Sequence, residues 1–150
     1  MCFYRKDHIF NYVGNYKHFK YHRDLLHTMR NCGLRAGEAV GLSEEAVDFE
    51  KGTIKITRTL NYKDNVGTGK KRKYISPTKS EYSNRTLPFI KTTKVRLKEH
   101  ERKMRIIGKN CVEKCGRTLG FYFHYPRWTT YSVDYLNQLL HRIVDSYNKQ

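Results

Sequence analysis

The sequence is poor in acidic side chains, in proline and in long apolar runs. It contains 14 Asp and Glu against 30 Lys and Arg, and 3 Pro in 150 residues. No stretch approaches the ~18 consecutive apolar residues that a membrane-spanning helix needs, so we expect no membrane partner. The first seven residues carry charges where a signal peptide needs an apolar stretch. We therefore expect a cytoplasmic protein.

Cysteine is scarce, which limits both disulfides and metal sites. The four cysteines are Cys2, Cys32, Cys111 and Cys115. The last two form a C-x3-C pair, but a zinc site needs a second pair of ligands. His124 and His141 are poorly spaced to supply that pair. We expect reduced thiols, no metal and no cofactor.

Positive charge is abundant and is concentrated in one third of the chain. The formal net charge is +16, and residues 51–105 alone carry +13. Such a concentration indicates a polyanionic partner, of which nucleic acid is the first choice. Membrane headgroups and a solvated basic surface are the alternatives, but no amphipathic basic helix long enough to favour a membrane is evident.

The helical pattern covers most of the chain. Apolar side chains recur at three- and four-residue steps, which predicts helices over 6–31, 35–42, 91–107 and 133–147. Gly33 is placed to end the first helix. Ser132 is a good N-cap for the last one. The face predicted to be apolar in that last helix contains Val133, Leu136, Leu140, Ile143, Val144 and Tyr147.

The β pattern is confined to the middle of the chain. Apolar and polar side chains alternate in TIKITRTL, which predicts a half-buried strand over 53–60. The charged, Gly-containing stretch 61–73 is typical of a loop, and residues 74–76 and 85–88 are interpreted as two sides of a hairpin. Pro77 and Pro88 restrict these strands to edges or ends. The short aromatic stretch 121–123 should be buried. The predicted class is α+β, mainly helical with a small antiparallel sheet.

The motif CGLRAGEAVGL carries the most chemical information. An arginine held at a break between two helices, here Arg35, can be aimed at one point, and its planar fork fits two oxygens of a phosphate. Glu38, three residues later, can orient that guanidinium or the turn. Alone, an arginine at a helix junction is more often structural than catalytic.

The context of that motif carries a resemblance to a known family. GLRAGEAVGL, then VDFEKGTIKI, then SPTKSEYSNRTLPF, resembles the catalytic domain of tyrosine recombinases, in particular the integrases of phages and conjugative transposons of Gram-positive bacteria. The resemblance runs from about residue 8 to the end. It implies double-stranded DNA as partner, other recombinase protomers in the assembly, no metal, and site-specific DNA integration or excision.

The resemblance also implies roles for individual residues. Arg35 corresponds to the arginine that grips the scissile phosphate, and Lys79 to the hairpin lysine that protonates the leaving 5′ oxygen. For Lys79 the alternative is an ordinary phosphate contact. Contacts to DNA are assigned to Lys70, Lys71, Arg72, Lys73 and Arg85. For Arg85 a structural role is the alternative, and Glu38 would be structural support.

Two further elements of the family motif are not placed. The family has a His-x-x-Arg motif and then a tyrosine nucleophile that forms a 3′-phosphotyrosine. His124 and Arg127 have that spacing but precede the last helix instead of following it, and Tyr131 and Tyr135 lie too close behind them. The resemblance therefore implies a truncated catalytic domain over residues 1–150, inactive alone.

Two other functions stay open at this point. The first is a non-catalytic DNA-binding protein that occupies recombination sites. The second is an RNA-binding module, since aromatics interleave with cations around Tyr62–Tyr82 and could stack on bases.

Overall fold

The computed structural model describes residues 3–64, 71–77, 84–106, 120–124 and 131–149. Its helices are α1 (Phe3–Asn15), α2 (Arg23–Cys32), α3 (Ala36–Val40), α4 (Lys91–Ile106) and α5 (Val133–Asn148), with short 3-10 turns η1 (Lys20–His22) and η2 (Glu44–Ala46). Its strands are β1 (Val47–Asp48), β2 (Thr53–Ile56), β3 (Arg58–Asp64), β4 (Lys71–Pro77) and β5 (Arg85–Pro88). The α+β class is confirmed.

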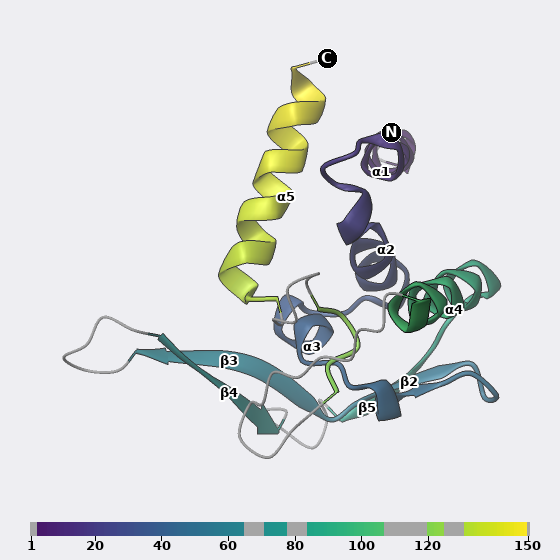
Figure 1. The fold of residues 1–150 in the computed structure, drawn as a ribbon, viewed down its shortest axis with the longest axis vertical. Coiled ribbons are helices and arrows are strands. Elements are labelled where there is room, and N and C mark those ends of the chain that lie inside the picture. Colours follow the sequence, from purple (N-terminus) through teal and green to yellow (C-terminus); the bar gives the residue numbers. More distant parts are fainter. Residues whose placement is uncertain (1–2, 65–70, 78–83, 107–119, 125–130, 150) are drawn as a thin grey trace.

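The helices form one layer and the strands lie along its lower edge (Figure 1). Helix α1 packs against α2 and α5, and α4 packs along α2. The short helix α3 lies between this layer and the strands, in contact with α2, α5 and β3. The junction between α2 and α3 is therefore the place where helices and strands meet.

The strands form two small antiparallel sheets, and the predicted hairpin is wrong. β2 lies between β1 and β5, with Thr53 opposite Pro88 and Ile56 opposite Arg85. β3 and β4 form a separate ribbon, with Arg58 opposite Pro77. Residues 74–76 therefore pair with β3, while 85–88 pair with β2. The two prolines stand at strand ends, as expected.

The predicted loop over 61–73 is partly strand, because β3 continues to Asp64 and β4 begins at Lys71. The predicted strand 53–60 is itself divided at Thr57 into β2 and β3. Beyond the buried Leu60, residues 61–64 and 71–73 contain no aliphatic side chains, so this part of the ribbon lacks the apolar alternation from which strands are identified.

The first and last helices also differ from the prediction. The helix expected over 6–31 is two helices, since the chain turns after Asn15 and buries Phe19 at the turn. Gly33 ends α2 in the left-handed conformation with φ of 63°, as expected. Ser132 caps α5 by accepting a hydrogen bond from the backbone N–H of Tyr135 at 2.9 Å.

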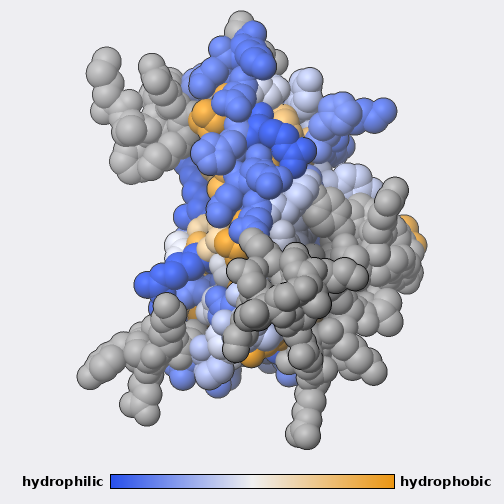
Figure 2. Space-filling model, turned by 90° about the vertical axis from the view of Figure 1, so that its left-hand side faces the viewer, coloured by the Kyte–Doolittle hydropathy of each residue, from blue (hydrophilic) through white to orange (hydrophobic). Residues whose placement is uncertain are grey.

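The buried face of α5 is rotated from the predicted one. Leu136, Leu139 and Ile143 are buried, whereas Leu140 and Val144 are 40% and 43% exposed. The packing against α1 and α3 selects Leu139, which periodicity alone could not decide. Figure 2 shows the outcome on the surface over α5, where small hydrophobic patches interrupt a mostly hydrophilic face.

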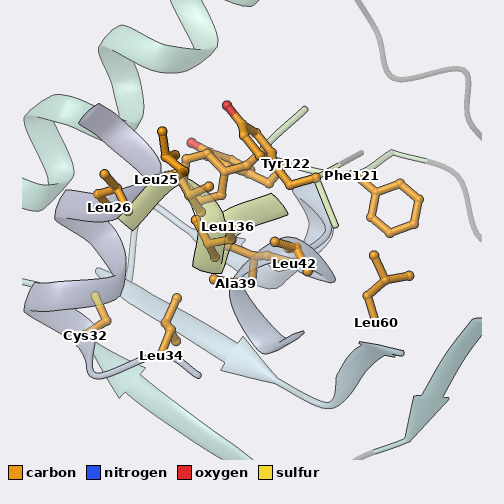
Figure 3. Close-up of a cluster of buried hydrophobic side chains, with 14 of the residues drawn as sticks. Leu25, Leu26, Cys32, Leu34, Ala39, Leu42, Leu60, Phe121, Tyr122 and Leu136 are labelled. Atoms are coloured by element: carbon orange, nitrogen blue, oxygen red, sulfur yellow. The ribbon is translucent and has the colours of Figure 1, made fainter. Parts of the chain in front are cut away.

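The core lies where α2, α3 and α5 converge (Figure 3). Leu25 and Leu26 enter it from α2, Ala39 from α3 and Leu136 from α5. The aromatic stretch Phe121–Phe123 is buried, as predicted. It is attached to the end of α3 by a hydrogen bond from the N–H of Tyr122 to the carbonyl of Leu42 at 2.8 Å.

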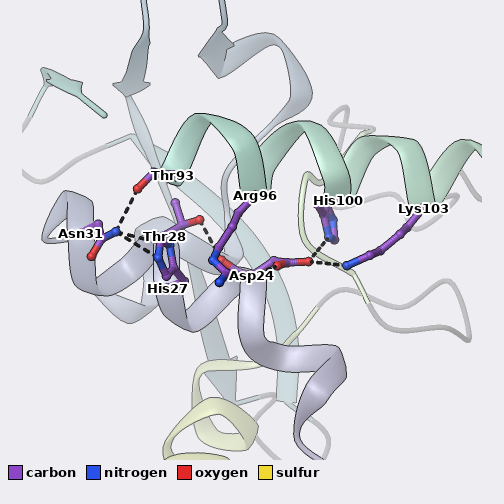
Figure 4. A network of polar contacts seen from close by, with 8 residues as sticks. All are labelled: Asp24, His27, Thr28, Asn31, Thr93, Arg96, His100 and Lys103. Carbon is purple, nitrogen blue, oxygen red and sulfur yellow. Dashed lines mark hydrogen bonds and ion pairs between the residues drawn. The ribbon is translucent and has the colours of Figure 1, made fainter. Parts of the chain in front are cut away.

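A second contact between helices is polar (Figure 4). The buried carboxylate of Asp24 on α2 faces two cationic side chains of α4, Arg96 at 4.0 Å and Lys103 at 3.5 Å, and the imidazole of His100 at 3.7 Å. About two turns further along α2, Asn31 donates a hydrogen bond to the hydroxyl of Thr93 at 3.0 Å. These contacts align α4 with α2.

Candidate nucleic-acid interface

Arg35 occupies the sharp turn between α2 and α3. The left-handed Gly33 reverses the chain, and Arg35 is the N-cap of α3 with extended φ and ψ of −70° and 153°. Its side chain is 74% exposed. A guanidinium at this point presents most of its N–H donors to the outside while its backbone is fixed by two helices.

The buried carboxylate of Glu38 binds Arg35 through hydrogen bonds. Its side chain is 2% exposed and both of its carboxylate oxygens are used. Oε2 accepts a hydrogen bond from the backbone N–H of Arg35 at 2.9 Å, which is half of a capping box. Oε1 accepts from Nη1 of Arg35 at 3.2 Å. The carboxylate therefore fixes both the main chain and the side chain of Arg35.

A second arginine reaches the same carboxylate from β5. Arg85 donates from Nη1 to Oε1 and from Nη2 to Oε2 of Glu38, both at 2.8 Å. This is the parallel, two-bonded geometry that arginine makes with carboxylates. Burial alone would raise the pKa of the Glu38 carboxyl, but the hydrogen bonds from Arg85 and Arg35 outweigh it and lower that pKa. Glu38 is accordingly ionised and compensated near neutral pH.

Helix α3 lies close to β3 because Gly37 within it and Gly41 at its C-cap have no Cβ atom on the side that faces the strand. A Cβ atom added at Gly37 would lie 2.6 Å from Cγ2 of Thr59, and one added at Gly41 would lie 2.8 Å from the backbone nitrogen of Leu60. Arg58 reinforces the contact by donating from Nε to the carbonyl of Gly41 at 2.9 Å. The spacing of glycines in the GLRAGEAVGL motif is thus a packing requirement.

The β3–β4 ribbon extends away from the body of the molecule (Figure 1). Its register places Lys71 opposite Asp64, Arg72 opposite Lys63 and Lys73 opposite Tyr62. The backbone register thus gathers basic residues along both strands of the ribbon. Of the cations predicted to contact DNA, Lys71, Arg72 and Lys73 therefore lie on this ribbon, and Lys70 lies outside the described residues.

The remaining predicted residues divide into described and undescribed ones. Lys79 and Arg127 lie outside the described residues. His124 is buried and lines a hollow of about 130 Å³ together with Glu44 and His100. The structure thus joins Arg35 with Glu38 and Arg85. The only sequence signal for the contact between Arg85 and Glu38 was the arginine of RTLP. Its partner lies 47 residues earlier and could not be identified from the sequence.

Tyr131 is engaged elsewhere in the fold. Its hydroxyl is 2.9 Å from Nδ1 of His22, and the side chain is 3% exposed. Burial strongly raises the pKa of the Tyr131 hydroxyl. A phenol that is buried and poorly acidic is a poor nucleophile.

Two other kinds of site, a metal centre and a membrane span, do not occur within the described ranges. There, no three His, Cys, Asp or Glu side chains group closely enough to hold a metal ion. None of the helices over these residues combines the length and apolar character needed to cross a membrane. Cys32 is a free buried thiol whose pKa is raised by burial.

Comparison with known proteins gives a fold match without a sequence match. No protein family model and no curated protein matches the chain. Among solved structures, it is similar to the Tn1549 transposon integrase in complex with transposon right-end DNA, with a TM-score of 0.82 and 20% identity. A complex of that integrase with a circular intermediate DNA gives a TM-score of 0.83 at 18% identity. XerA recombinase gives 0.58 at 10% identity over 90% of this chain and 38% of its own.

The match covers a much larger share of this chain than of the integrase chain. The match to the Tn1549 integrase includes 99% or 100% of this chain but 45% of the integrase chain. The predicted α+β fold is thus one that this chain shares with the matched part of the integrase. Over the residues described, the chain has the fold of that 45% of the transposon integrase and, more distantly, of the XerA recombinase.

Proposed function

We propose that this chain binds double-stranded DNA and is the first part of the catalytic domain of a site-specific tyrosine recombinase. The observation that carries the proposal is the exposed guanidinium of Arg35, anchored on buried Glu38 at a helix junction. It occurs in a fold shared with an integrase whose solved structures are complexes with DNA. A cytoplasmic location, where DNA is accessible, follows from the proposal.

In this function Arg35 would bind two oxygens of the scissile phosphate. An arginine held in place before the reaction stabilises charge that develops on phosphate oxygens without reorganising. Lys79 would protonate the leaving 5′ oxygen, and other protomers of the recombinase would assemble on the same DNA. In the whole protein these groups would act with a tyrosine nucleophile in breaking and rejoining strands.

The β3–β4 ribbon supports DNA as the polyanion. The major groove of B-DNA admits a two-stranded β-ribbon. The ribbon carries Lys71, Arg72 and Lys73 on one strand and Lys63 on the other, and Tyr74 is 41% exposed beside them. Together with Lys70 they would contact the phosphate backbone on either side of the groove.

The test is the salt dependence of binding to a short labelled duplex, measured by fluorescence anisotropy over ~50–200 mM salt. Roughly six phosphate contacts give a slope of about −5 in a plot of log affinity against log salt. Arg35→Ala should reduce the affinity about tenfold and the slope by about one. Lys51→Ala is the matched control, because Lys51 is 80% exposed but lies on the β1–β2 turn. Salt-insensitive binding, or equal losses in both variants, would contradict the proposal.

A DNA-binding role without catalysis is the second candidate, and it fits the burial of Tyr131 against His22, which leaves that tyrosine unsuited to attack a phosphate. The two candidates differ in covalent chemistry. We expect the 150-residue polypeptide alone to form no covalent adduct with a nicked duplex, because catalytic residues that act as a unit fail together. An adduct should appear when a segment supplying the His-x-x-Arg and tyrosine is added in trans. An adduct formed by the 150 residues alone would show that they are already sufficient for cleavage.

A further inference from the structure

We propose that Arg85 is a positioning residue: acting through Glu38, it fixes the phosphate-binding guanidinium of Arg35 and does not itself bind DNA. The inference rests on the proposed function, since it concerns how Arg35 is prepared for a phosphate. It assigns to Arg85 a role different from the DNA contact expected of a cation in a basic region.

The geometry of Glu38 is that of a bridge with two equivalent sides. Oε1 accepts hydrogen bonds from Nη1 of Arg85 and Nη1 of Arg35. Oε2 accepts from Nη2 of Arg85 and the backbone N–H of Arg35. Each oxygen thus joins one N–H of Arg85 to one of Arg35. A shift of the carboxylate displaces the side chain and the main chain of Arg35 together.

The two arginines differ in what they present to the outside. The side chain of Arg85 is 27% exposed, and its two terminal nitrogens are both directed at Glu38. The side chain of Arg35 is 74% exposed and uses one terminal nitrogen on Glu38 at the longer distance of 3.2 Å. The geometry therefore suits Arg85 to hold the carboxylate and Arg35 to meet a ligand.

The backbone of Arg85 is itself held in place by the sheet. It lies on β5 opposite Ile56, which is 2% exposed, so its backbone is anchored in the sheet. Without Arg85, Glu38 would be placed by the short helix α3 alone. An exposed arginine loses side-chain freedom when it binds, and a restrained one loses less. The expected contribution of Arg85 is thus to the affinity of Arg35 for phosphate.

The experiment is a double-mutant cycle on duplex binding with wild type, Arg35→Ala, Arg85→Lys and the double variant. Lysine keeps the positive charge but loses the planar fork that spans both carboxylate oxygens. We expect Arg85→Lys to weaken binding about five- to tenfold, close to the loss in Arg35→Ala. The double variant should be no weaker than Arg35→Ala within about twofold, with the same salt slope.

Arg96→Lys is the matched control. Arg96 has similar exposure, 24%, and also faces a buried carboxylate across two elements, that of Asp24. Its ion-pair partner is Asp24 and not Glu38. A general loss of packing would therefore affect both lysine variants alike, whereas a loss of positioning would affect only Arg85→Lys. We expect Arg96→Lys to leave duplex affinity within about twofold of wild type.

The outcomes separate the inference from the function on which it rests. If the losses from Arg35→Ala and Arg85→Lys multiply, Arg85 contacts DNA itself and the positioning role is wrong, while DNA binding stands. If the wild-type chain binds no duplex, the proposed function and the positioning role both fail.

Folding is checked by thermal denaturation of every variant. Should Arg85→Lys be unfolded at the assay temperature, the cycle is run at a temperature at which its denaturation curve shows it folded. Arg85→Gln, whose amide can still donate a hydrogen bond to Glu38, is then the second variant. Its loss must likewise vanish in the Arg35→Ala background, and a loss that persists there overturns the inference.

Discussion

Two buried carboxylates join elements of this molecule, and they do so in different ways. Glu38 binds Arg85 by two hydrogen bonds of 2.8 Å and also accepts a backbone N–H. Asp24 faces Arg96, Lys103 and the imidazole of His100 at 3.5 to 4.0 Å, and the nearest of them, Lys103, is 47% exposed. The first is a directional bridge and the second a cluster of loose ion pairs.

The difference follows from what each carboxylate has to hold. Asp24 aligns two helices that also pack through apolar contacts, such as buried Leu97 on α4. Glu38 joins a helix of five residues to a strand of four, and neither is stable without partners. A hydrogen-bonded pair fixes orientation, whereas ion pairs at longer distance tolerate displacement.

The largest expected effect on stability is that of Glu38→Gln. This change leaves Arg85 without its charge partner and weakens the cap of α3, so we expect a loss of about 3 kcal/mol in the free energy of unfolding. Urea denaturation followed by circular dichroism measures it. Glu50→Gln, at an exposed position in the β1–β2 turn, should stay within about 0.5 kcal/mol of wild type. Equal values for the two variants would remove the distinction drawn above.

On acidification, the contribution of His22 to stability should be lost at higher pH than the contributions of the carboxylates of Glu38 and Asp24. Burial lowers the pKa of His22 from 6.5 to about 4, with a smaller contribution from Arg142. A pKa that is lower when folded gives stability that is present above 6.5 and is lost as pH falls to 4. The expected loss is about 2–3 kcal/mol.

The pKa values of Glu38 and Asp24 are lowered from 4.5 and 3.8, so their contributions are lost as pH falls below those ordinary values. His22→Gln should therefore flatten the stability curve between pH 6.5 and 4.5 and leave the acid limb below it. Unfolding midpoints measured across this range test the expectation. A slope between pH 6.5 and 4.5 that survives in His22→Gln would show that His22 is not its source.

The smallest effect is expected for Asp24→Asn. Its ion pairs are long and one partner is half exposed, so we expect a loss of about 1 kcal/mol. Asp145→Asn on the exposed face of α5 is the control, with a change within about 0.5 kcal/mol. A loss as large as that of Glu38→Gln would show that distance is a poor guide to the strength of these pairs.

Local signals in the sequence predicted much of the fold. Gly33 as the end of α2, Ser132 as the cap of α5 and the buried stretch 121–123 each depend on neighbouring residues, and all are confirmed. The prediction of strand pairing was wrong because pairing depends on residues that are distant in the sequence. Nothing near Arg85 indicates that its strand pairs with β2, or that its guanidinium binds a carboxylate 47 residues earlier.

In the candidate site too, contacts between residues close in the sequence were predictable and contacts between distant residues were not. Arg35 and Glu38 are three residues apart, so the sequence alone indicated that one could orient the other. The seating of α3 on β3 by Gly37 and Gly41 could not be predicted, because a glycine in a helix has several explanations until its neighbour is known. In the same way, Leu139 replaces Leu140 in the core because of where α1 and α3 lie.

The contact of Gly37 and Gly41 with β3 has a mechanical consequence. At Gly37 and Gly41 the backbone lies against Thr59 and Leu60 of β3 with no room for a Cβ atom. Because close-packed interiors transmit displacement, we expect a contact that bends the β3–β4 ribbon to shift the turn that carries Arg35 as well.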